Sequence, residues 1–180
     1  GQRVRDMLSD RKYHGSYERV ASVLKLINLP DADLARFFEQ VACMVMVRNG
    51  DGHLKNFGVL YSNHDDLRLA PMFDVVSTSI YKYQRYDGGP ELEDHTMALK
   101  LFAGSKGSKV YPTPAELLDF GRRVCGVSNP RAVVERIAQG MALTLSNCRN
   151  DHRISAQLHE QISATWEPGF MLSKEVGRGA

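Results

Sequence analysis

The stretch Asn49–Asn56, NGDGHLKN, runs directly into the apolar stretch Phe57–Tyr61, FGVLY, and Pro71–Asp74, PMFD, follows a short distance further on. These segments place two carboxylates, an amide, an imidazole and an ammonium group close together in the chain. In a phosphoryl-transfer site one Asp orients the hydroxyl nucleophile, while an Asn and a second Asp hold Mg²⁺ on the nucleotide phosphates. The order Asp, Asn, Asp in these segments therefore predicts a kinase catalytic loop followed by a metal-binding Asp.

Each polar side chain of this stretch suits one part of that chemistry. Asp51 can accept or orient a hydroxyl proton of the substrate. Asn56 offers a neutral oxygen and Asp74 an anionic one, a ligand set that suits Mg²⁺ when phosphate oxygens and water complete the shell. Lys55 or His53 can neutralise charge on the phosphoryl group in transfer.

Simpler interpretations exist for each of these residues taken alone. An Asp-Gly pair such as Asp51-Gly52 is commonly a turn. His53 can be a hydrogen-bonded loop histidine, and Asp74 can begin a strand or cap a helix. The joint pattern favours a functional site, because the polar groups cluster between two strongly apolar elements.

The surrounding pattern predicts a mainly helical domain with one small antiparallel β-hairpin. Apolar residues recur at helical spacing over 17–28 and 33–48, so the second of these helices leads straight into the polar loop. The runs 57–61 and 67–70 predict the hairpin, whose open ends would bring Asn56 and Asp74 together.

The later part of the chain predicts further helices. We expect a loop over 77–90, a strand over 96–102, and a helix over 113–124 that begins with a capping box. Two more helices are predicted, one opening at Asn129-Pro130 and one that includes 154–166. The residues after Gly169 show little pattern.

Composition limits the possible functions. With 180 residues, 43% hydrophobic and 24% charged, the chain fits one folded domain spanning 1–180. The net charge of +2 does not indicate nucleic-acid binding, and the basic clusters (Lys100, Lys106, Lys109, Arg122 and Arg123) read as solvated surface. No apolar run approaches the ~20 residues that span a bilayer.

The three cysteines lie far apart and form no metal-binding or disulfide pattern. This usage predicts a reducing, cytoplasmic location. Cys43 sits in an apolar helical run and is expected in the core.

The segment Arg48–Leu60 resembles the catalytic loop of the HipA-type serine/threonine kinases, and Arg68–Ser77 resembles that family's metal-binding segment. Lys12-Tyr13 and Met97–Lys100 are weaker matches of the same kind. The resemblance implies Asp51 as catalytic base. It also implies Asn56 and Asp74 as Mg²⁺ ligands, with His53, Lys55 and Phe73 at the nucleotide, ATP.

The resemblance further implies a helical C-terminal lobe of a protein-kinase-like fold. The first residues show no Gly-rich phosphate loop with its Lys, and the chain starts at Gly1 without an initiator Met. We therefore expect a fragment that lacks the N-terminal lobe and is inactive in isolation. In the intact protein the expected partners are a protein substrate and a HipB-like DNA-binding antitoxin, as in toxin–antitoxin pairs.

Three alternatives stay open on sequence grounds. The Asp-x-His-x-x-Asn order also suits a kinase of a small molecule or lipid headgroup. A second alternative is a non-catalytic module that binds an antitoxin or another subunit. A more remote one is a metal-dependent phosphoesterase built on Asp51, His53, His64 and Asp74.

Overall fold

The computed structural model describes residues 10–63, 66–104 and 109–178, and it is mostly helical with two small antiparallel sheets. Its helices of eight or more residues are α2 (Tyr17–Leu26), α3 (Asp31–Met46), α5 (Pro130–Cys148) and α6 (Ala156–Arg178). The shorter helical pieces are η1 (Arg11–Tyr13), η2 (Leu54–Asn56), η3 (Thr78–Ile80), α4 (Pro114–Asp119) and the π-helical η4 (Phe120–Val124). The strands are β1 (Val59–Tyr61), β2 (Leu67–Leu69), β3 (Lys82–Tyr83) and β4 (Leu92–Glu93).

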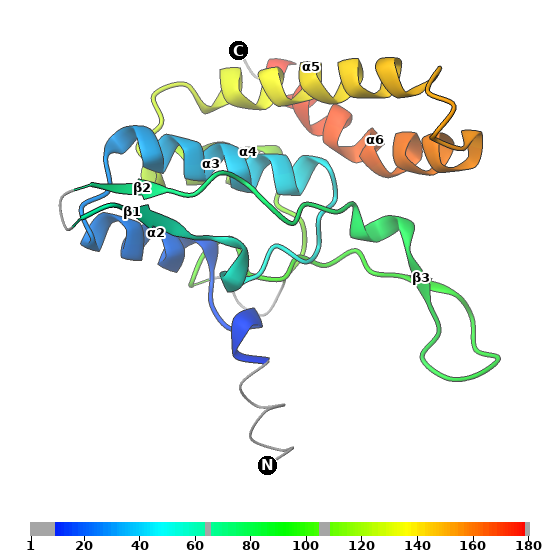
Figure 1. Ribbon diagram of the computed structural model, residues 1–180, viewed down its shortest axis with the longest axis horizontal. Helices are drawn as coiled ribbons and strands as arrows, with labels where there is room; N and C mark the ends of the chain where they lie inside the picture. Colours follow the sequence, from blue (N-terminus) through cyan, green and yellow to red (C-terminus); the bar gives the residue numbers. More distant parts are fainter. Residues whose placement is uncertain (1–9, 64–65, 105–108, 179–180) are drawn as a thin grey trace.

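Helix α3 is the centre of the molecule. Figure 1 shows α5 and α6 on one side of it and the β1–β2 hairpin with α2 on the other, an arrangement that the contacts between these elements support. Its side chains Phe37, Phe38, Val41 and Met44 are fully buried. A helix that is apolar on nearly all sides has to be covered on all sides, and these neighbouring elements cover α3.

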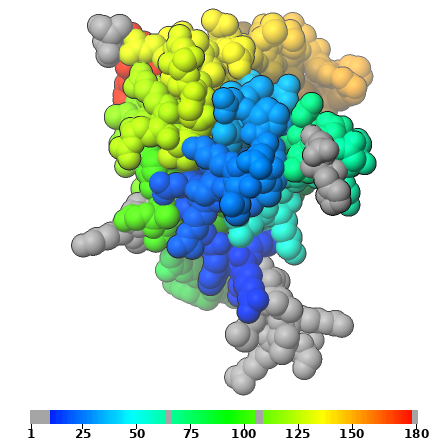
Figure 2. Space-filling model, turned by 90° about the vertical axis from the view of Figure 1, so that its left-hand side faces the viewer, coloured from blue at the N-terminus to red at the C-terminus, as the bar shows by residue number. Residues whose placement is uncertain are grey.

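Helix α2 lies across the middle of the face seen in Figure 2, with the hairpin on one side and the α4 region on the other. Its N-cap Ser16 accepts a hydrogen bond from the backbone N–H of Arg19. The predicted capping box at Thr113 is also confirmed, since Thr113 and Glu116 bond each other's backbone N–H groups. The side-chain oxygen of Asn129 caps α5 by accepting a hydrogen bond from Ala132 N.

The predicted hairpin is confirmed as β1 and β2, paired in antiparallel register with Val59 opposite Leu69. A further bond from Ala70 N to Gly58 O, at 2.9 Å, extends the pairing toward the open end of the hairpin. The open end is where the polar loop and the PMFD segment enter and leave.

The expected strand over 96–102 was wrong. The segment forms only isolated bridges, Ser16 to Lys100 and Thr96 to Val110. Its alternating apolar residues do enter the core, where Leu99 is fully buried. Its backbone, however, bonds to the start of α2, where Lys100 O accepts a hydrogen bond from Tyr17 N. The N–H group of Tyr17 lies at the start of the helix, where backbone N–H groups have no partner inside the helix.

Two other expectations also need correction. The expected loop over 77–90 contains η3 and β3, and β3 pairs with β4 in the second small sheet. The patternless residues after Gly169 continue α6 as far as Arg178, with Leu172 and Val176 buried. A Cβ on Gly169 would collide with Met46 O, so glycine allows this helix to lie directly against the end of α3.

Cys43 is half-buried rather than enclosed in the core, and all three cysteines are free thiols. Among residues 10–63, 66–104 and 109–178, no helix combines the length and apolar character that crossing a membrane requires.

Candidate active site

The polar loop begins where α3 ends. Arg48 has a φ of 58°, a left-handed conformation that turns the chain away from the helix axis. Asn49 follows and is fully buried, with its N–H bonded to Met44 O at 2.9 Å. The side-chain oxygen of Asn49 accepts from Asp51 N at 3.0 Å. This buried turn fixes the backbone that carries the Asp51 carboxylate, which is exposed.

Two glycines allow this backbone to lie tightly against the core. A Cβ on Gly50 would be 2.6 Å from Thr96 O, and a Cβ on Gly52 would be 2.7 Å from Met44 Sδ. Both distances are too short for any side chain. The phenol of Tyr17, itself buried, donates to Gly52 O at 2.8 Å. The loop on both sides of Asp51 is therefore held by close packing and a buried hydrogen bond.

Asn56 and Asp74 meet, as the sequence predicts. Asn56 lies in η2 and is buried, and its Nδ2 donates to Asp74 Oδ2 at 2.8 Å. Its Oδ1 accepts from His53 N at 2.9 Å. Asp74 has a φ of 56° and an exposed carboxylate. Among the described residues only Asn28, Arg48 and Asp74 are non-glycine residues with positive φ, so two of the three belong to this region.

The structure places the other predicted residues on the same loop and segment. His53 is buried with 6% exposure, and its Nδ1 has no hydrogen-bond partner in the described part of the chain. A buried polar atom without a partner is costly unless a ligand or water satisfies it. Lys55 is exposed and Phe73 is 46% exposed, so both face solvent.

Contacts that the sequence did not predict join the two segments. Thr78 Oγ1 accepts from Gly50 N at 2.7 Å, and Thr78 N donates to Arg48 O at 3.1 Å. Trp166 Nε1, from α6, donates to Ser77 Oγ at 2.8 Å. Tyr13 Oη, from η1, donates to Asp51 Oδ1 at 2.9 Å. Periodicity gives no signal for such contacts, because the partners are distant in sequence.

Burial keeps Tyr17 and Tyr111 neutral. Desolvation raises the pKa of Tyr17 well above its usual value and raises the pKa of Tyr111 to about 12. The guanidinium of Arg48 stacks over the Tyr111 ring, 4.2 Å from the ring centroid, and burial lowers the pKa of Arg48. At physiological pH both phenols keep their protons: that of Tyr17 donates to Gly52 O, and the ring of Tyr111 packs against Arg48.

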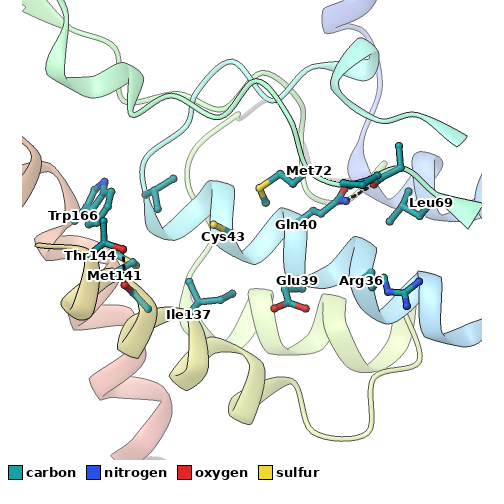
Figure 3. A pocket seen from close by; sticks show the side chains of 14 residues that line it. Arg36, Glu39, Gln40, Cys43, Leu69, Met72, Ile137, Met141, Thr144 and Trp166 are labelled. Atoms are coloured by element: carbon teal, nitrogen blue, oxygen red, sulfur yellow. Dashed lines mark hydrogen bonds between the residues drawn. The ribbon is translucent and has the colours of Figure 1, made fainter. Parts of the chain in front are cut away.

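A separate cavity of about 700 Å³ lies between α3, α5 and α6 and is lined mainly by apolar side chains. In Figure 3 Met72, Cys43, Ile137, Met141 and Trp166 surround it. Gln40 at its edge donates to Ala70 O at 2.9 Å. The cavity contains neither Asp51 nor Asp74, so the predicted catalytic residues lie elsewhere.

The phosphoesterase alternative has no support from metal-ligand clustering. No group of three His, Cys, Asp or Glu side chains within residues 10–63, 66–104 and 109–178 has the geometry to hold a metal ion. His64, which that alternative requires, lies outside the described residues.

The fold and the site together define a helical domain that presents two carboxylates and an amide on adjoining loops. A model of the HipA-like C-terminal domain matches residues 2–148, and the chain belongs to that family. A protein of Sinorhizobium fredii named as a proposed kinase, Y4dM, is 36% identical over 73 residues, which are 40% of this chain and 18% of that protein.

A protein of Haemophilus influenzae, also named as a proposed kinase, is 30% identical over 102 residues, 56% of this chain and 27% of that protein. The matches thus span less than a third of either relative. Helix α6, beginning at Ala156, lies beyond the part of the chain that the family model covers.

Proposed function

We propose that residues 1–180 form the C-terminal catalytic lobe of a HipA-type serine/threonine protein kinase, with a protein-kinase-like fold. The lobe would transfer the γ-phosphoryl group of ATP to a protein hydroxyl. Family membership and two relatives named as proposed kinases support this class of reaction. The observation that carries the proposal is the 2.8 Å contact between Asn56 and Asp74, two residues at the open end of one hairpin, next to the loop that presents Asp51.

The side chains present fit a magnesium ion held with ATP. Asp74 is exposed and offers a carboxylate, and Asn56 Oδ1 has a second lone pair beyond its bond to His53 N. Mg²⁺ takes few protein ligands and completes its shell with phosphate oxygens and water, so one amide and one carboxylate suffice. When bound, the ion supplies charge neutralisation on the β- and γ-phosphates.

The chain's own residues would divide the remaining work. Asp51, exposed on a rigid loop, accepts a hydrogen bond from the substrate hydroxyl and orients it toward the phosphoryl group. Within the described residues the buried Nδ1 of His53 has no hydrogen-bond partner, and the position of His53 beside Asn56 supports a role for it in contacting the nucleotide. Lys55 and Phe73 are exposed next to the same pair and would contact the nucleotide phosphates and base.

The complete site also needs a phosphate-binding loop and a lysine on the α/β-phosphates. We propose that a further lobe supplies these groups, as part of the same polypeptide or of a partner. The protein substrate and a DNA-binding antitoxin are expected partners of that whole assembly, in a cytoplasmic toxin–antitoxin pair.

The test is phosphoryl transfer by the complete polypeptide that carries these residues, with radiolabelled ATP and a total protein extract as acceptor. Asp51→Ala should abolish labelling of protein, while the matched control Asp87→Ala, an exposed loop residue remote in sequence from the site, should retain it. Labelling that survives Asp51→Ala would contradict the proposal. Label found only in small molecules or lipids would show that the acceptor is not a protein.

A further inference from the structure

The side chain of Asp51 has one hydrogen-bond partner within the described residues, the phenol of Tyr13. The Tyr13 Oη to Asp51 Oδ1 distance is 2.9 Å, normal for a hydroxyl donating to a carboxylate. Tyr13 belongs to η1, which packs against η2 of the catalytic loop. The contact therefore joins the start of the described chain to the proposed catalytic base.

Tyr13 is itself held from several directions. Its backbone O accepts from Lys109 Nζ at 3.1 Å, and its ring meets the His53 ring edge-on at 5.4 Å. The ammonium groups of Lys12 and Lys109 lie 4.7 Å and 5.6 Å from its ring centroid. Such cation–π and aromatic contacts orient a ring as well as stabilise it. The phenol is therefore presented to Asp51 in a defined direction.

An exposed aspartate is free to rotate about χ1 and χ2 unless a neighbour fixes it. The backbone around Asp51 is held by close packing, but among the described residues the carboxylate has only the Tyr13 phenol to fix its rotation. A donor on Oδ1 leaves Oδ2 open to a substrate hydroxyl. Holding a reacting group in its productive orientation accounts for a large part of enzymatic rate acceleration.

We propose that Tyr13 is a positioning residue for phosphoryl transfer, whose phenol holds the Asp51 carboxylate in the orientation that receives the substrate hydroxyl. This inference rests on the proposed function. Tyr13 has no proposed role in binding ATP or metal, so it acts on turnover and leaves nucleotide binding unchanged.

Another reading of the same contact is that the phenol occupies the place of a substrate hydroxyl and is itself phosphorylated. The lysines over the Tyr13 ring are compatible with a phosphoryl group there. We favour positioning because Lys109 and His53 fix the ring beside the base, whereas a substrate side chain has to leave after reaction. Mass spectrometry of the protein after incubation with ATP separates the two, since phosphate on Tyr13 would overturn the positioning role.

The decisive variant is Tyr13→Phe in the complete polypeptide, because Phe keeps the ring and its contacts and removes only the hydroxyl. We expect kcat to fall about 10- to 100-fold, the usual effect of removing a group that orients a catalytic residue. The KM for ATP should stay within about twofold of wild type. Tyr61→Phe makes the same chemical change at a side chain that is 78% exposed and should leave kcat unchanged.

Three results separate the possibilities. An unchanged kcat in Tyr13→Phe, with Asp51→Ala inactive, would overturn the positioning role and leave the proposed function intact. Activity retained in Asp51→Ala would instead contradict the proposed function itself. A fall in both melting temperature and ATP affinity without a specific loss of kcat would show a merely structural tyrosine.

Discussion

Trp166 Nε1 donates a hydrogen bond to Ser77 Oγ across 2.8 Å, and this bond ties helix α6 to the segment that carries Asp74. Ser77 is buried, and its neighbour Thr78 bonds Gly50 N at 2.7 Å. One short stretch therefore connects α6, the proposed metal ligand and the loop of Asp51. Helix α6 begins beyond residue 148, the last residue of the family match, so this bond reaches the site from outside the matched segment.

Replacing Trp166 by Phe should weaken that support. The substitution keeps an aromatic ring in place and removes the indole N–H, leaving Ser77 Oγ short of one partner. We expect the free energy of unfolding to fall by about 1 kcal/mol, typical of a lost intramolecular hydrogen bond. Urea denaturation followed by circular dichroism measures this change in the free energy of unfolding. A variant as stable as wild type would show that the bond contributes nothing in solution.

Gly52→Ala should be destabilising. Its Cβ would be 2.7 Å from Met44 Sδ and 3.0 Å from Tyr17 Oη, and Tyr17 is fully buried. Overpacking of this kind costs about 1–3 kcal/mol. Gly140→Ala is the matched control, since the Cβ there meets no atom within 4 Å and alanine favours the helix. Measured by thermal unfolding, the melting temperature should fall in Gly52→Ala and rise in Gly140→Ala.

The thiol of Cys125 should make stability fall at alkaline pH. Burial raises the pKa of Cys125 from 9.0 to about 12. Between these values the unfolded thiol has lost its proton while the folded thiol keeps it, so the folded state binds more protons and stability decreases as pH rises. Cys125→Ala removes this contribution. Its free energy of unfolding should decline less steeply than that of wild type from pH 9 upward, and parallel curves would contradict the assignment.

The sequence predicted the helices and the first hairpin because their apolar spacing coincides with burial. Phe37, Phe38 and Val41 follow one helical face and are all enclosed. The same rule failed over 96–102, where alternating side chains enter the core from an irregular backbone. It failed again after Gly169, where the sequence shows little pattern although α6 continues and Leu172 and Val176 are buried.

The candidate site was also predictable only in part. Hairpin topology was enough to bring Asn56 and Asp74 together, because the open ends of paired strands are adjacent. Contacts from Tyr13, Thr78 and Trp166 were not predictable, since each depends on how distant elements pack. These long-range contacts hold the loop in place, and local periodicity carries no information about them.

In the proposed function Asn56 and Asp74 share one ion that serves phosphoryl transfer. The most direct measurement is the Mg²⁺-dependent kcat/KM of the complete polypeptide carrying Asn56→Ala, Asp74→Ala or both changes, compared through a double-mutant cycle. We expect each single change to lower the rate by at least about 100-fold and the double change to lower it little further, because removing either ligand already loses the ion. Losses that multiply, or a double variant with wild-type activity, would show that the two residues do not share an ion.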